Sequence, residues 1–211
     1  QRREDAAARR RDAIVIRERY TPLDPSLMDG LGAGAVGSEV ASFFVGPGGV
    51  DGARPARGAL FQVQLPVTGP HAGGVAQPHP GVFVFRLLSE ALCARLWAET
   101  EHYHATALER DLPLPVRHDG GLDLSRVFPK ALHSIADAAR PAIRTLLPPE
   151  LHDVELRHAF RTKNYVGRDE SFKRHVDKYA VTLNVCLHKT ADVVGSGVFF
   201  YASGSPELPP A

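Results

Sequence analysis

The sequence has few cysteines, no long apolar run and almost no excess of charge. Its only cysteines, Cys93 and Cys186, are too few for a disulfide framework, which favours a reducing compartment such as the cytoplasm. No apolar stretch reaches the roughly 18 residues that a membrane-spanning helix needs, and no signal-peptide core follows the Arg-rich N-terminus. Twenty-five Lys and Arg against 24 Asp and Glu leave a net charge of +1. The sequence therefore predicts a soluble protein with neither membrane nor nucleic-acid partners.

The composition is that of an ordinary folded domain. Apolar residues make up 44% of the 211 residues and charged residues 23%, close to globular averages. This length suits one domain, or one domain with a tail. Because the first residue is Gln rather than Met, we expect the chain to be a piece of a longer protein.

Three segments of different composition divide the chain. Residues 1–20 mix Ala, Arg and acidic residues ahead of Pro22, which predicts a helix that ends near Tyr20 and has a solvated charged face. Residues 21–80 are rich in Gly, Pro and Ala, which predicts an irregular arm with about two short strands. Residues 81–211 carry regular apolar patterns and form the third segment.

The apolar spacing of this third segment predicts helices first and strands after them. We expect a strand at 82–85, helices from Glu90 to about Leu108 and from Lys130 towards Leu147, and strands at 154–165, 179–187 and 193–201. Leu92, Leu96 and Tyr103 lie near one face of the first helix, and Pro141 is expected to kink or divide the second. Helices followed by a run of strands predict an α+β fold with the helices packed on one face of a sheet or partial barrel.

The segment His175-Val176-Asp177 carries the strongest chemical signal. It lies just before the predicted strand YAVTLNVCL. In extended backbone, residues i and i+2 point to the same face, so His175 and Asp177 can reach one metal ion. An imidazole and a carboxylate are two ligands of the two-histidine, one-carboxylate triad that binds non-haem iron and leaves positions open. For the motif alone, a surface His beside an Asp remains the simpler interpretation.

A longer pattern surrounds this pair. Upstream stands LRHAFRTKNYVGRDESFKRHVDKY and downstream VTLNVCLHKTADVVGSGVFFY. Together they resemble the iron(II) and 2-oxoglutarate-dependent dioxygenases of the prolyl and lysyl hydroxylase type. The resemblance spans about Val82 to Tyr201 and is strongest from His158 to Phe200. The matching positions are Gly167, Asp169, His175, Asp177, Thr182, Leu183, Asn184, Val185, Gly195 and Phe200.

The resemblance implies a fold, a reaction and a set of cofactors. The fold would be a partial double-stranded β-helix, or jelly roll, with supporting helices. His175 and Asp177 would bind Fe²⁺, 2-oxoglutarate would chelate the same ion as co-substrate, and L-ascorbate would be a further cofactor. The reaction would couple oxidative decarboxylation of 2-oxoglutarate to hydroxylation of a prolyl or lysyl side chain, or of a related protein or small-molecule substrate.

The chain departs from the family pattern at two places. The family has a Tyr close to the iron and co-substrate, but alignment on Gly167 puts Asn164 there and Tyr165 one residue further, on the opposite face unless a bulge intervenes. Tyr165 is therefore the candidate co-substrate residue. The family also has a distal His, followed by a basic residue, on a strand well after the Gly-rich turn. Among the 34 residues after Asp177 the sole His is His188, which ends the very next strand and is too near in sequence to play that part. We expect the natural chain to continue past Ala211 and this piece to be inactive alone.

Two alternatives stay open. A chain that retains the sheet without the third ligand would be a non-catalytic binding module. The glycines of residues 32–37 fit GxGxxG, a nucleotide-binding pattern, but no buried strand precedes them and no long helix follows, so a flexible linker is favoured. Of the remaining candidates, His102 and His104 are interpreted as surface or packing residues. His158 is interpreted as a sheet residue satisfied by hydrogen bonds, and Cys186 as a buried residue of an apolar strand rather than a nucleophile.

Overall fold

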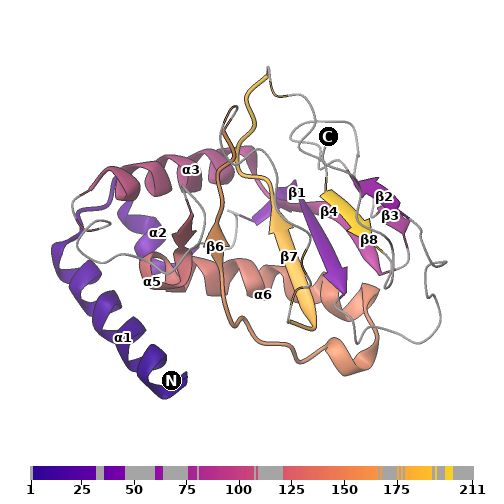
Figure 1. Ribbon diagram of the computed structural model, residues 1–211, viewed down its shortest axis with the longest axis horizontal. Coiled ribbons are helices and arrows are strands. Elements are labelled where there is room, and N and C mark those ends of the chain that lie inside the picture. The colour runs from indigo at the N-terminus through magenta and orange to yellow at the C-terminus, as the bar shows by residue number, and fades with distance from the viewer. Residues whose placement is uncertain are drawn as a thin grey trace. The chain divides into compact units, whose positions relative to one another are not determined.

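The structure is a computed structural model with several helices and short strands (Figure 1). It describes residues 2–31, 36–45, 60–63, 76–79, 81–106, 108, 121–165, 167, 175, 177, 179–191, 193 and 198–201. The chain divides into two compact units. The first comprises Gln1–Val36, Ala91–Pro141 and Glu155–His175, and the second Gly37–Glu90, Ala142–Val154 and Val176–Ala211.

The first unit is mainly helical. Its elements are α1 (Arg2–Arg19), α2 (Pro25–Asp29), α3 (Glu90–Ala105), β5 (Leu122–Asp123), α5 (Leu124–Val127), β6 (Phe160–Arg161) and most of α6 (Pro129–Leu146). Strand β5 pairs with β6 antiparallel, and α1 packs against α5. The buried apolar residues of this unit include Ile16, Tyr20, Leu27, Leu92, Cys93, Leu96, Tyr103, Leu122, Val127, Phe128, Ala131, Ile135 and Ala139. Their burial provides the main stabilisation of the unit.

A buried carboxylate ties the chain after α1 to α3. Glu99 is fully buried, and its Oε1 accepts hydrogen bonds from the Tyr20 hydroxyl (2.5 Å) and the Leu23 backbone N–H (3.1 Å). Its Oε2 accepts one from the Asp24 N–H (2.7 Å). Burial, followed by the hydrogen bond to Glu99, raises the pKa of Tyr20 well above its usual range. Tyr20 therefore remains a hydrogen-bond donor at every ordinary pH.

A second buried charge joins α1 to α5 and β5. The Arg126 side chain is 8% exposed, and its Nη1 lies 2.5 Å from Asp12 Oδ2 of α1. Its Nε lies 3.4 Å from Oδ2 of Asp123, a side chain that is 1% exposed. Because charges out of water need compensating charges, this arrangement fixes α1 against the rest of the unit.

Helix α2 begins and ends with residues suited to those positions. Asp24 caps it by accepting from the N–H (3.1 Å) and hydroxyl (2.6 Å) of Ser26, and Pro25 stands at the first turn, where no N–H is needed. Gly30 ends it with φ = 101°, and a Cβ there would meet Ser134 Oγ at 3.4 Å. A side chain at this position would be strained by the left-handed backbone.

The second unit contains most of the strands. They are β1 (Val36–Val45), β2 (Leu60–Val63), β3 (Ala76–His79), β4 (Val82–Leu88), β7 (Val181–Val185) and β8 (Val198–Tyr201), with the 3-10 helix η1 (Pro149–Leu151). Four of them form a sheet in the order β3-β4-β1-β7, and β2 pairs with β8. Strand β7 runs antiparallel to β1, with Val185 opposite Ala41 and Val181 opposite Val45.

The helices agree closely with the expectations from the sequence. Helix α1 ends at Arg19, beside the predicted end at Tyr20, and α3 and α6 lie where the apolar spacing predicted helices. Residues Leu92, Leu96 and Tyr103 are buried, as predicted. Pro141 does not divide α6, which continues to Leu146. The helix tolerates it, although proline removes one backbone hydrogen bond.

The strands agree less well. Of the predicted strand 154–165, only Phe160–Arg161 forms a strand, because its partner β5 is itself two residues long. The described residues of the Gly/Pro-rich arm form one helix, α2, and three strands, β1 to β3, one strand more than the two expected. The signal for α2, Asp-Pro-Ser, was present in the sequence.

Candidate metal-binding site

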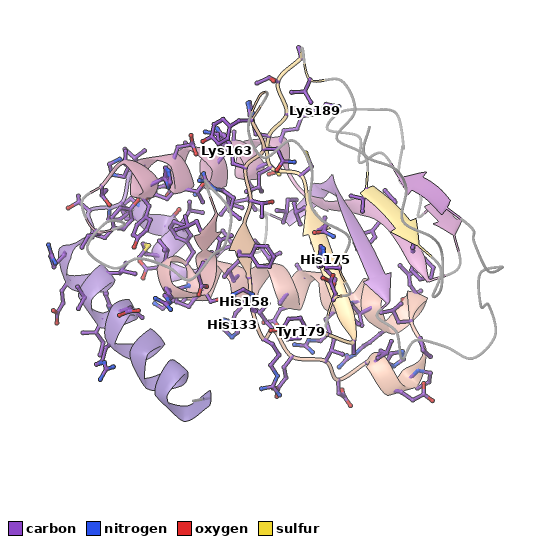
Figure 2. The ribbon with its side chains drawn as sticks, in the orientation of Figure 1. His133, His158, Lys163, His175, Tyr179 and Lys189 are labelled. Atoms are coloured by element: carbon purple, nitrogen blue, oxygen red, sulfur yellow. The ribbon has the colours of Figure 1, made fainter. Side chains whose placement is uncertain are left out.

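The two candidate iron ligands lie just before β7. His175 is exposed and is labelled in Figure 2, whereas Asp177 is half-buried. A single residue separates them, so their proximity follows from the chain itself.

The Asp177 side chain is held by a residue of β7. Thr182, the second residue of β7, donates a hydrogen bond from Oγ1 to Asp177 Oδ2 over 2.8 Å. Thr182 lies opposite Phe44 of β1, so the sheet fixes its position. A hydroxyl that donates to a carboxylate restricts its rotation and leaves lone pairs on both oxygens for a metal ion.

No third ligand joins this pair among the residues that the structure describes, which contain no group of three or more His, Cys, Asp or Glu side chains able to hold a metal. His188 lies beyond the end of β7 and is exposed. Of the family pattern, Asp169 and Gly195 lie outside the described residues, and Gly167 is exposed with φ = 80°.

The candidate co-substrate residue, Tyr165, lies in a cluster of charged and aromatic side chains in the first unit. Lys163 Nζ is 4.8 Å from the centre of the Tyr165 ring and 5.0 Å from that of Trp97 on α3. It also lies 2.6 Å from Glu101 Oε2. Glu101 Oε1 pairs with Arg161, which is 3% exposed and lies over the Trp97 ring at 5.4 Å. Tyr165 therefore shares the face of the chain that carries Arg161 and Lys163.

The charges in this cluster reinforce each other. Burial disfavours the charged form of Glu101, but hydrogen bonds from Lys163 and Arg161 outweigh it, and the pKa of Glu101 is lowered. Burial likewise opposes the charge of Lys163, but its hydrogen bonds to Glu101 and Tyr165 raise its pKa. Both side chains are ionised at neutral pH.

Replacement of Glu101 by glutamine should reduce the free energy of unfolding by about 1 kcal/mol at neutral pH. The effect is this small because Glu101 and its partner Lys163 are partly exposed. Because the folded-state pKa of Glu101 is lowered, its contribution is present above the ordinary value of 4.5 and is lost as the pH falls through the folded-state pKa. Denaturant unfolding between pH 3 and pH 8 should show the wild type and Glu101→Gln converging at acidic pH. The exposed pair of Glu155 and Arg157 provides the control Glu155→Gln, with a smaller effect. A constant difference across this range would contradict the assignment.

The cluster of Trp97, Glu101 and Lys163 was not predicted from the sequence. Two cationic residues and Tyr165 at alternate positions were a usable signal, because an extended chain turns such residues to one face. Their aromatic and acidic partners stand on α3, 60 or more residues away, and no local pattern connects them.

The other candidates are placed as follows. His102 Nε2 lies 3.0 Å from the Thr21 carbonyl oxygen, which agrees with a packing role. His158 Nε2 is 3.9 Å from Asp123 Oδ2 and its side chain is 25% exposed. Cys186 was predicted to lie in a buried strand, but β7 ends at Val185, and Cys186 is half-buried with its Sγ 3.8 Å from the His188 carbonyl oxygen. The predicted strand therefore extended two residues beyond the observed one, which ends at Val185.

The segment that follows the glycine pattern does not support nucleotide binding. Gly32 and Gly34 lie outside the described residues, and Gly37 lies in strand β1. A phosphate-binding loop of this kind needs a helix directly after it, so that the helix N-terminus faces the phosphates. A ten-residue strand follows here instead.

Within the described part of the chain, every helix is too short or too polar to cross a membrane. Comparison of the chain with protein-family models, with curated proteins and with solved structures finds no match.

Proposed function

We propose that this chain is part of an iron(II) and 2-oxoglutarate-dependent dioxygenase that hydroxylates a prolyl or lysyl side chain or a related substrate. The single observation that carries the proposal is the exposed His175 followed by a half-buried Asp177 whose carboxylate is fixed by Thr182. The family resemblance supplies the reaction, the co-substrate, the L-ascorbate and the partial double-stranded β-helix fold. The cytoplasm remains the favoured location.

The donor atoms of His175 and Asp177 are of the kinds that bind Fe²⁺. Imidazole nitrogen and carboxylate oxygen are both ligands of non-haem iron, and a hydrogen bond to the ligating carboxylate is the usual support for such a ligand. When bound, the ion would supply the chemistry that activates dioxygen while 2-oxoglutarate is decarboxylated. The chain's own part would be to hold the ion through His175 and Asp177 and to keep the Asp177 carboxylate oriented through Thr182.

The proposal requires a third donor, which the resemblance places on a later strand. Two donors hold a labile divalent ion weakly, so residues 1–211 alone should bind iron poorly. The alternative is a binding module that uses the same sheet without catalysis. A distal His followed by Arg or Lys downstream would favour the enzyme.

Turnover by the full-length protein tests the proposal directly. With Fe²⁺, 2-oxoglutarate and L-ascorbate, it should release succinate and carbon dioxide in equal amounts, and candidate prolyl or lysyl peptides should raise the rate. A chelator should stop the reaction, and added Fe²⁺ should restore it. If purified full-length protein with bound Fe²⁺ releases no succinate above the protein-free rate with or without peptides, the binding module is the correct interpretation.

A further inference from the structure

The ammonium group of Lys163 lies close to three groups that attract a cation. The centres of the Trp97 and Tyr165 rings lie 5.0 Å and 4.8 Å from Nζ, and Glu101 Oε2 lies at 2.6 Å. All four residues belong to the first unit. Figure 2 shows Lys163 beside α3, the helix that carries Trp97 and Glu101.

This combination matches a primary ammonium ion in charge and shape. The faces of indole and phenol rings carry negative electrostatic potential and attract cations within about 6 Å of their centres. A carboxylate accepts one of the three N–H donors that an ammonium presents. Two rings and one carboxylate are therefore suited to bind a primary ammonium ion.

Two of the three walls are fixed by contacts that do not involve Lys163. Trp97 and Glu101 stand four residues apart on α3, so they share one side of the helix. Arg161 is almost fully buried, pairs with Glu101 Oε1, and lies 5.4 Å from the centre of the Trp97 ring. It also donates to Thr100 Oγ1 over 3.1 Å. The indole and the carboxylate therefore keep their places if the Lys163 side chain is shortened.

The site is accessible to a ligand. The side chains of Lys163 and Glu101 are 22% and 34% exposed. An ion from solvent can therefore reach the position of Nζ once the lysine stem is removed.

We propose that Trp97, Glu101 and Tyr165 form a binding site for a primary alkylammonium ion, the terminal group of a lysyl side chain, and that Lys163 occupies this site in the native chain. The chain's own lysine thereby excludes free amines and holds the segment 161–165 against α3. This inference uses no metal ligand, and its test does not require oxygenase activity, but it gives a second role to Tyr165, the candidate co-substrate residue.

Binding of n-butylammonium chloride to the Lys163→Ala variant tests the inference. Trp97 is the only tryptophan of the chain, so its fluorescence reports on this site alone. At constant ionic strength, the amine should change the emission saturably, with a dissociation constant of about 1 mM or weaker, as expected for so small a ligand. The wild type, whose site is occupied, should show no saturable change, and 1-butanol should have no effect on either protein.

Matched variants separate charge recognition from simple filling of space. Lys163→Met keeps most of the stem without the charge and should bind no amine. Adding Glu101→Gln to Lys163→Ala should weaken amine binding about tenfold or more, because the charged hydrogen bond is lost. Equal responses to butanol and butylammonium, or unchanged affinity without the carboxylate, would overturn the inference.

If Lys163→Ala does not fold, the inference can still be tested with variants that leave no cavity at position 163. The native ammonium lies against the indole face, so Lys163→Met should shift the emission maximum of Trp97 relative to the wild type. Lys163→Arg, which keeps a cation, should shift it less. Identical spectra for the wild type and Lys163→Met would contradict occupation of the site by Lys163.

Discussion

Replacement of Asp177 by alanine is expected to abolish 2-oxoglutarate turnover by the full-length protein. The carboxylate is the only anionic donor in the proposed ligand set, and its loss leaves a divalent ion held by neutral imidazoles. The loss should exceed the roughly 10- to 100-fold that follows removal of a group that merely supports a ligand. Succinate release and Fe²⁺ affinity, measured on the same preparation, should fall together.

Thr182 provides a graded comparison for this experiment. Thr182→Val keeps the shape of the side chain but removes the hydroxyl that donates to Asp177 Oδ2, and it should weaken Fe²⁺ binding by about 10- to 100-fold. Thr182→Ser should retain most of the affinity. Asp153→Ala, at an exposed carboxylate of the second unit, should have no effect. Undiminished turnover in a folded Asp177→Ala protein would exclude this residue as a ligand.

The largest effect on stability is expected at Glu99. Glu99→Ala removes the acceptor of the Tyr20 hydroxyl and of the N–H groups of Leu23 and Asp24. Each donor left unsatisfied costs about 1–3 kcal/mol, so the free energy of unfolding should fall by about 3 kcal/mol or more. Chemical denaturation monitored by circular dichroism measures this change.

Two controls locate the cause of that loss. Tyr20→Phe removes one of the three donors and leaves the carboxylate with its two backbone partners, so its effect should be smaller, about 1 kcal/mol. Glu90→Gln changes an exposed acidic residue at the start of the same helix and should stay within about 0.5 kcal/mol of the wild type. If Glu99→Ala were as stable as Glu90→Gln, the network around Glu99 would not stabilise the fold.

Local patterns in the sequence predicted the helices well. The spacing of Leu92, Leu96 and Tyr103 located α3 and its buried face, because helical periodicity depends on residues only three or four apart. Burial of Glu99 could not be predicted in this way. Its partners stand 75 to 79 residues earlier in the chain, and a lone Glu on a helix normally faces water.

The residues of the candidate site differ in the same way, because some were predictable from local spacing and others were not. His175 and Asp177 were found because their spacing is local, whereas the partners of Tyr165 on α3 depend on tertiary packing. The short strand β6 has the same origin, since the β-prone residues from Val154 onward extend well beyond the two residues that find a partner in β5. Whether a β-prone segment becomes a strand depends on its neighbour as well as on its own residues.

Because Arg126 is buried, its ion pairs should make the stability of the first unit less sensitive to added salt. Mobile ions screen charges that stand in water over about 8 Å at physiological ionic strength but act little on charges enclosed by protein. The exposed pair of Lys130 and Asp29 should therefore weaken as salt is added, while the attraction between Arg126 and Asp12 should largely persist. Helix α1 should therefore remain packed against α5 at high salt concentration.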